Sequence, residues 1–146
     1  MKLLKIILFL VISFNTSLIA NSNDDLQNIL SEGGKLIFIR HAYAPGTGDP
    51  DNFDISNCNS QRNLNKEGVE QAKDIGKFFL KNHIEGNIVL SSEWCRCQQT
   101  AKYAFKNYET KSFLNSFYNQ KFAHKKVNQI KELKEYIQKW NGKGNL

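Results

Sequence analysis

The chain has 146 residues, which is enough for one globular domain and too few for several. Its 20 lysines and arginines exceed its 14 aspartates and glutamates, giving a formal net charge of +6. Many of the excess lysines lie in the last third of the chain and alternate with apolar residues at helical spacing, so we expect a solvated helix face and no nucleic-acid partner.

The first 20 residues are typical of an export signal. A basic "MKLLK" precedes an apolar "IILFLVISF" and a small, polar "NTSLIA", which is the order of regions in a secretory signal peptide. The apolar core is too short for a comfortable membrane-spanning helix. We expect cleavage after Ala20, with an uncleaved anchor as the alternative because Leu18 fits a cleavage site poorly. The protein is therefore expected to be exported, periplasmic or extracellular, with a domain over residues 21–146 that meets a membrane only through such an anchor.

The first two elements expected in this domain are a helix and a strand. Residues 24–32 have a short apolar stripe at helical spacing, and Gly33-Gly34 ends it. The apolar run at residues 36–39, within "KLIFIRHA", predicts a buried strand. This strand leads directly into Arg40 and His41, which places a cation and an imidazole at its carboxyl end.

A long loop separates these elements from the next pair. Residues 42–62 contain both prolines with several aspartates and asparagines, and loops this long in compact domains are usually functional or disordered. Asn65 is a suitable N-cap for a helix that reaches about residue 80. After a turn at Gly86-Asn87, residues 88–90 predict a second short buried strand.

Two further helices complete the expected order of elements. One opens near Ser92 and has an apolar stripe from Trp94 to Tyr108, and the last covers about residues 125–140. Strands that alternate with helices predict an α/β domain with a mainly parallel sheet. Ligands of such sheets bind at the carboxyl ends of the strands. Here those ends carry Arg40-His41 and, through Ser91-Ser92, Arg96.

One histidine among three arginines suggests chemistry on phosphate. Positive charge on Arg40, Arg62 and Arg96 would lower the pKa of His41 and keep its ring neutral and nucleophilic. Guanidinium groups match phosphate oxygens and stabilise a transferring phosphoryl group. The sequence therefore predicts phosphoryl transfer through a phosphohistidine, without a metal or another cofactor. Arg62 has an alternative role, which is to neutralise the acidic residues of the loop, Asp49, Asp51 and Asp54.

Three segments, taken in order, resemble the signatures of the histidine phosphatase superfamily, the phosphoglycerate mutase-like proteins. They are "FIRHA", which is similar to the RHG signature, "RNLNKEGVEQAKDIGKFF" and "VLSSEWCRCQQTA". Ala42 replaces the usual glycine, and Asn65 stands where serine or threonine is usual. The stretches "APGTGDP", "NCNSQRNL" and "SSEWCRC" further resemble a small exported subgroup of this superfamily.

The resemblance implies a fold and a set of roles. The fold is a three-layer α/β/α sandwich with a mainly parallel sheet, and the activity is hydrolysis of small phosphomonoesters. His41 would accept the phosphoryl group, which Arg40 and Arg96 would bind. Arg62 and Thr47 would be substrate-binding residues. The general acid is open between Asp49 and Glu93.

A second histidine that the family carries late in its sequence has no counterpart here. In the family it follows a strand that lies between the two strands expected above, whereas this chain reaches only "WNGKGNL". Neither His83 nor His124 lies at a strand end. We therefore expect a sheet without its last central strand. Two explanations stand: a C-terminally truncated form of a longer phosphatase, or an inactive relative that binds phosphorylated ligands without turnover.

The three cysteines, Cys58, Cys95 and Cys97, leave at least one thiol free because their number is odd. Export would allow Cys58 to pair with Cys95 or with Cys97, pinning the long loop near Arg96. The alternative is that Cys58 and Cys97 are small core residues. No histidine or cysteine pair has zinc-like spacing, so no metal site is expected.

Overall fold

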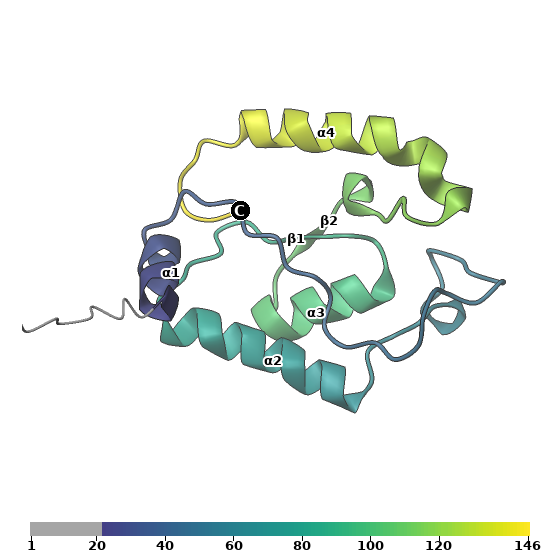
Figure 1. The fold of residues 1–146 in the computed structure, drawn as a ribbon, viewed down its shortest axis with the longest axis horizontal. Coiled ribbons are helices and arrows are strands. Elements are labelled where there is room, and N and C mark those ends of the chain that lie inside the picture. The colour runs from purple at the N-terminus through teal and green to yellow at the C-terminus, as the bar shows by residue number, and fades with distance from the viewer. Residues whose placement is uncertain (1–21) are drawn as a thin grey trace, which may run out of the picture.

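The computed structural model describes residues 22–146, in which helices surround a short parallel sheet (Figure 1). The α-helices are α1 (Ser22–Ser31), α2 (Lys66–Lys81), α3 (Cys95–Phe105) and α4 (Lys126–Lys139). The strands are β1 (Leu90–Ser91) and β2 (Glu109–Thr110), and the 3-10 turns are η1 (Cys58–Ser60), η2 (Ser112–Leu114) and η3 (Gln120–Lys125). The predicted signal peptide lies outside the described residues. Among residues 22–146, no helix has the length and apolar character needed to cross a membrane.

The predicted helix after the long loop is confirmed as α2. The Asn65 side chain accepts a hydrogen bond from the Gly68 N–H at 2.9 Å, as an N-cap should. Two glycines let α2 approach its neighbours, since a Cβ at Gly68 would overlap the Tyr43 carbonyl and one at Gly76 would overlap the Ala104 carbonyl of α3. The segment just after His41 and the helix α3 are therefore both packed against α2.

The helix predicted to open near Ser92 begins three residues later. α3 starts at Cys95, its N-cap residue Trp94 makes no side-chain cap hydrogen bond, and the Ser92 hydroxyl instead accepts from the Trp94 N–H at 3.2 Å. The last helix is confirmed as α4, within one residue of the predicted ends. In Figure 1, α4 lies on one side of the strands and α2 with α3 on the other.

The sheet is smaller than predicted and has an unexpected partner strand. β1 pairs in parallel with β2, so that Leu90 lies opposite Glu109 and Ser91 opposite Thr110. The sequence did not predict β2, because its exposed, charged residues lack the apolar signal of a buried strand. The coarse prediction of an α/β fold with a parallel sheet is consistent with this architecture.

The prediction of a buried strand at residues 36–39 is wrong. This segment forms no regular strand, and Leu36, Phe38 and Ile39 are 39%, 72% and 42% exposed. Its start pairs with the end of the chain: the Ile37 N–H donates to the Leu146 carbonyl at 2.7 Å, and the Leu146 N–H donates to the Lys35 carbonyl at 3.0 Å. Beyond these bonds no strand of residues 22–146 lies beside the segment, which explains its exposure.

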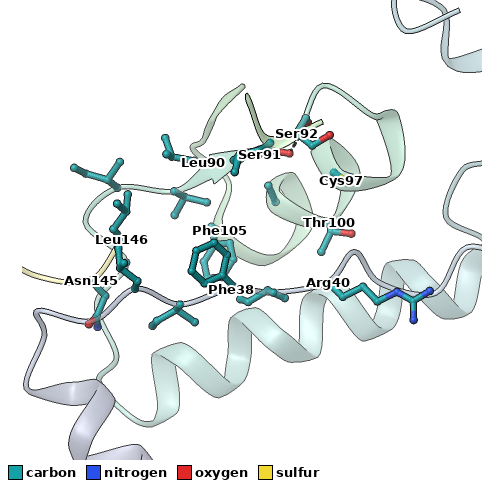
Figure 2. A pocket seen from close by; sticks show the side chains of 18 of the residues that line it. Phe38, Arg40, Leu90, Ser91, Ser92, Cys97, Thr100, Phe105, Asn145 and Leu146 are labelled. Carbon is teal, nitrogen blue, oxygen red and sulfur yellow. Dashed lines mark hydrogen bonds between the residues drawn. The ribbon is translucent and has the colours of Figure 1, made fainter. Parts of the chain in front are cut away.

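The residues at 145–146 lie between the two segments that were predicted as strands. Asn145 forms a parallel bridge with Gly86 on one side, while Leu146 pairs with residues 35–37 on the other. Ahead of Leu146 a groove of about 380 Å³ remains open, which we call the central groove. Its walls are mostly apolar and include Leu36, Phe38, Ile88, Phe105, Leu133 and Ile137. Figure 2 shows Asn145 and Leu146 at one end of it and Arg40 with Ser92 toward the other.

Candidate functional site

His41 lies half-buried where the extended segment meets the long loop. Its Nδ1 is 2.7 Å from the Ala42 carbonyl oxygen. A carbonyl oxygen only accepts, so Nδ1 carries the hydrogen and a neutral ring keeps its lone pair on Nε2. The Ala42 N–H donates to the Thr100 hydroxyl at 2.9 Å, and that hydroxyl donates to the Arg96 carbonyl at 2.8 Å. The His41 backbone is thus fixed to α3, next to Arg96.

The pKa of His41 lies below its ordinary value, as the sequence predicted. Burial of the imidazole is the main cause, and the charges on Arg96, Arg40 and Arg62 lower the pKa further, against the hydrogen bond to Ala42, which raises it. The predicted direction is therefore confirmed, while the arginines are secondary to burial as its cause.

This pKa can be checked directly by titrating the His41 ring proton signals in NMR spectra. We expect a midpoint below 6.5, so the imidazole stays neutral and nucleophilic down to that pH. Arg40→Gln should raise the midpoint only part of the way toward 6.5, because burial contributes more than this charge. A parent midpoint at or above 6.5 would contradict the buried environment, and a full return in Arg40→Gln would contradict the ranking of causes.

The guanidinium groups of Arg96 and Arg62 are both held in place, and each keeps one buried N–H donor without an acceptor. Arg96 is 8% exposed, and its Nη1 binds the Asp49 carboxylate at 2.7 Å. The Nη1 of Arg62 donates to the carbonyls of Ala44 and Gly46 at 2.5 and 2.6 Å. In both arginines Nε is buried and unpaired. A buried unpaired donor is costly, so two of them on cations near His41 favour an anionic ligand.

Asp49 ties the long loop to the start of α3. Its carboxylate accepts hydrogen bonds from the Arg62 N–H at 3.1 Å, from Arg96 at 2.7 Å and from the Trp94 indole at 3.1 Å. Burial alone would raise the pKa of Asp49, but these hydrogen bonds and the Arg96 charge lower it overall. A carboxylate held ionised in this way is a poor proton donor, which argues against Asp49 as the general acid. Glu93, whose carboxylate accepts from Asn115 at 2.6 Å, is the remaining candidate.

The other predicted site residues are placed differently. The Arg40 side chain is exposed and lines the central groove. Thr47 is exposed between Gly46 and Gly48, and within residues 22–146 it makes no hydrogen bond to His41 or to the arginines. The alternative role for the Arg62 side chain, neutralising the loop acids, is wrong because its guanidinium donates to backbone carbonyls and forms no salt bridge within residues 22–146. Its backbone N–H is the group that donates to a loop acid, Asp49.

Sequence reasoning missed two features of this site. It did not foresee the clamp that Asp49 forms with Arg96 and Trp94, because the three residues meet only when the loop folds back onto α3. It also missed Thr100, although the i, i+4 spacing of Arg96 and Thr100 on one helix signals that the two side chains share a face.

Comparison with known families decides the relationship. A family model described as the histidine phosphatase superfamily, branch 1, matches residues 36–145. The chain belongs to the histidine phosphatase superfamily. No curated protein and no solved structure matches the chain. Within the described residues, no cluster of histidine, cysteine and acidic side chains has the arrangement of a metal site.

In this superfamily member a disulfide bond fastens the long loop to α3. Cys58 is bonded to Cys95, with a Cα–Cα distance of 5.6 Å, and Cys97 is free. This resolves the open pairing in favour of Cys95, the first of the two cysteines that flank Arg96. Burial raises the pKa of the Cys97 thiol, so this side chain stays in its neutral, unreactive thiol form.

Removing this disulfide bond is expected to weaken the fold. The double variant Cys58→Ser/Cys95→Ser should lose about 2–4 kcal/mol of unfolding free energy, because the unfolded chain regains loop freedom. Urea unfolding of the oxidised proteins measures the loss, with Cys97→Ala as the matched control. Peptide mass spectrometry without reductant should find Cys58 joined to Cys95. Unchanged stability of the double variant, or a bond that involves Cys97, would contradict the assignment.

Proposed function

We propose that this protein is a phosphatase that hydrolyses small phosphomonoesters through a phosphohistidine at His41. The observation that carries the proposal is the pair of buried, unpaired Nε–H donors on Arg62 and Arg96 near a neutral imidazole with its lone pair on Nε2. Membership of the superfamily supports phosphatase or mutase chemistry in general. The charges of both arginines act on the imidazole, so an anion that they bind lies within the electrostatic reach of the nucleophilic ring nitrogen.

The reaction has two steps. In the first, Nε2 of His41 attacks phosphorus, the N–P bond forms, the P–O ester bond breaks, and the leaving oxygen takes a proton, for which Glu93 is the remaining candidate donor. In the second, water attacks phosphorus, its proton passes to the carboxylate left on Glu93, the N–P bond breaks with its electron pair returning to Nε2, and inorganic phosphate leaves. Arg96 and Arg40 bind the phosphoryl oxygens, with Arg62 and Thr47 as further substrate-binding residues. No metal or organic cofactor enters either step.

The proposed setting is outside the cytoplasm, in the periplasm or the extracellular space. Residues 1–20 act as the signal peptide, and the chain is a member of the small exported subgroup. The Cys58–Cys95 bond supports this setting, because structural disulfides persist in oxidising compartments. The partner is a small phosphorylated substrate, with no nucleic acid, and a membrane is met only through an uncleaved signal.

A second candidate function is binding of phosphorylated ligands without turnover. The open central groove supports this alternative. We propose that the fold is of the three-layer α/β/α sandwich type, in which the central groove is the place of a strand that carries the second histidine. The parallel pairing of Asn145 and Leu146 with both walls of the groove supports this proposal. Without such a strand, the site has anion-binding arginines and a nucleophile but lacks one phosphate contact.

The phosphohistidine itself is the direct test of the main proposal. The protein is mixed with a phosphomonoester, quenched in alkali and examined by mass spectrometry of its peptides. We expect phosphate on the peptide that contains His41, stable in alkali and lost in acid. Hydrolysis of the ester with no phosphate trapped, or phosphate trapped on another residue, would refute the mechanism.

The planar guanidinium of Arg96 should stabilise the transferring phosphoryl group. Replacing Arg96 with alanine alone would leave the Asp49 carboxylate without its cationic partner, so the cleaner variant is Arg96→Ala combined with Asp49→Ala. We expect kcat/KM to fall about 10²–10³-fold, as when other electrostatic contacts to a transition state are lost. Steady-state kinetics on a phosphomonoester measures the fall.

The companion variant is Arg96→Lys, which keeps the charge beside Asp49. An ammonium cannot form the two-pronged contact of a guanidinium, so we expect most of the activity to stay lost. Asp49→Ala alone is the matched control for the clamp. Parent-like kcat/KM in Arg96→Lys would rule out a role for the planar group.

A further inference from the structure

A second cavity lies beside the candidate site and is distinct from the central groove. It has a volume of about 540 Å³ and lies between the long loop and the segment that leads into α4. We call it the Phe122 cavity; its lining includes Phe53, Glu93, Trp94, Lys121, Phe122 and Lys125. The proposed mechanism uses none of these residues except Glu93.

Three aromatic rings form one wall of the Phe122 cavity. The Phe53 ring stacks on the Trp94 indole, with centroids 5.1 Å apart and an interplanar angle of 25°. The Phe122 ring meets both edge-on, at 5.7 Å from each. Such a surface suits a flat, apolar group, because planar rings bury much area and pack in stacked or edge-to-face geometry.

Two lysines stand over this wall with free charges. The Nζ atoms of Lys121 and Lys125 lie 5.8 and 5.7 Å from the centroid of the Phe122 ring. Neither lysine forms a salt bridge with a carboxylate of residues 22–146. These two charges, with the planar wall below them, suit a ligand that joins a ring to an anionic group.

The acidic residues of the lining are largely engaged elsewhere. The Glu93 carboxylate accepts from Asn115 at 2.6 Å, and the Asp54 carboxylate accepts from the Ser56 hydroxyl at 2.7 Å. Glu132, on α4, is the acid of the lining that makes no such hydrogen bond within the described chain. The cationic side of the cavity is therefore the side formed by η3.

Trp94 connects the Phe122 cavity to the candidate phosphoryl site. Its indole N–H donates to the Asp49 carboxylate at 3.1 Å, and its ring centroid is 5.9 Å from the guanidinium carbon of Arg96. The same ring lines the cavity. One indole thus separates the cavity from the arginine proposed to hold the phosphoryl group.

We propose that the Phe122 cavity binds the alcohol portion of the substrate and selects phosphomonoesters of flat, preferably aromatic alcohols that carry a further negative charge, such as a carboxylate. This inference rests on the proposed function for its phosphoryl site. The ring packs on the wall of Phe53, Trp94 and Phe122, while the anionic substituent meets Lys121 and Lys125.

Binding is tested apart from turnover by Trp94 fluorescence. The chain has two tryptophans, so Trp140→Phe leaves Trp94 as the single indole. Titration with 4-hydroxybenzoate and with phenol, both without phosphate, should quench Trp94, with tighter binding of the carboxylate. In Lys121→Ala/Lys125→Ala the ratio of the Kd for phenol to the Kd for 4-hydroxybenzoate should fall roughly three- to tenfold. This is the loss expected when two exposed ion pairs are removed. The matched control is Lys134→Ala/Lys139→Ala, which removes two lysines of α4 outside the cavity lining.

Turnover separates this proposal from the proposed function. The ratio of kcat/KM for 4-carboxyphenyl phosphate to that for phenyl phosphate should fall by the same factor in Lys121→Ala/Lys125→Ala and stay unchanged in the control. Quenching without hydrolysis of either ester would support the cavity and count against the phosphatase. Hydrolysis with equal ratios in the parent and the double variant, or no quenching by 4-hydroxybenzoate, would overturn the assignment of the cavity.

Discussion

Replacing His41 with alanine is expected to abolish hydrolysis of phosphomonoesters. Nε2 of His41 is the one ring nitrogen left with a lone pair by the hydrogen bond between Nδ1 and Ala42, and the low pKa keeps that lone pair free at neutral pH. Removing a nucleophile costs on the order of a thousandfold or more in kcat, because the remaining contacts only position the substrate. Steady-state rates with a simple aryl phosphate measure the loss.

The control for this variant is His83→Asn. His83 is exposed and has a φ of 54°, a conformation that asparagine tolerates, so the substitution removes an imidazole without disturbing the fold. Its hydrolysis rate should match that of the parent. Phosphate binding should survive in His41→Ala, since Arg62 and Arg96 keep their unpaired donors. A variant that lacks His41 and hydrolyses esters at the parent rate would show that the phosphoryl group goes to water directly or to another residue.

The helices that the sequence predicted well are those whose signals are local. Asn65 caps α2 with its own side chain, and Gly68 and Gly76 stand at the two positions where α2 touches neighbouring backbone. The ends of α4 follow from its apolar spacing in the same way. These signals involve residues a few positions apart, so they are readable before any tertiary contact is known.

The strands were predicted less well, because a strand depends on partners that lie far along the chain. The apolar run at residues 36–39 has the composition of a buried strand, yet only its start pairs with another backbone, at Leu146, and its side chains are largely exposed. Conversely, β2 has no apolar signal and forms because its backbone pairs with that of β1, with Glu109 opposite Leu90. Period and composition do not specify which distant backbone supplies the hydrogen bonds.

The sequence predicted which residues belong to the candidate site, but not the contacts that those residues make with one another. His41 and Arg96 could be singled out from their places after predicted strands and from motif order. The clamp between Asp49 and Arg96, over a separation of 47 residues, depends on how the long loop folds back. It also reversed one interpretation, since an acid that was a candidate proton donor turned out to hold an arginine instead.

The last prediction is that a strand added after Leu146 will occupy the central groove. Both walls already pair with the chain at Asn145 and Leu146, and both continue past that point. The wall at residues 36–39 has exposed apolar side chains, including Phe38 at 72%, and the wall at residues 88–90 has half-buried ones. Unpaired edges of this kind accept a further strand readily. A strand entering in the same direction would run toward Arg40 and Ser92 (Figure 2).

The experiment adds five residues, Val-Ile-Val-Thr-His, directly after Leu146. New backbone hydrogen bonds and the burial of Phe38 and its neighbours should outweigh the ordering of the added residues, for a net gain of about 1–3 kcal/mol in unfolding free energy. Urea unfolding measures the gain, and the fluorescence of a dye that binds exposed apolar surface should fall. The control extension, Gly-Ser-Asp-Pro-Ser, has the same length but cannot pair along both walls.

The same extension should change activity. With the groove open, the His41 backbone is held through hydrogen bonds of the next two residues, Ala42 to α3 and Tyr43 to α2. A misplacement of about 1 Å relative to Arg96 can cost roughly a hundredfold in rate. We therefore expect the 146-residue chain to hydrolyse esters slowly but measurably, and the strand-forming extension to raise kcat/KM at least about tenfold over the control extension. Replacing the added histidine with alanine separates its phosphate contact from the packing of the strand. Brisk hydrolysis by the 146-residue chain, unaltered by either extension, would mean that the site is complete without a strand in the groove and that another residue supplies the second phosphate contact.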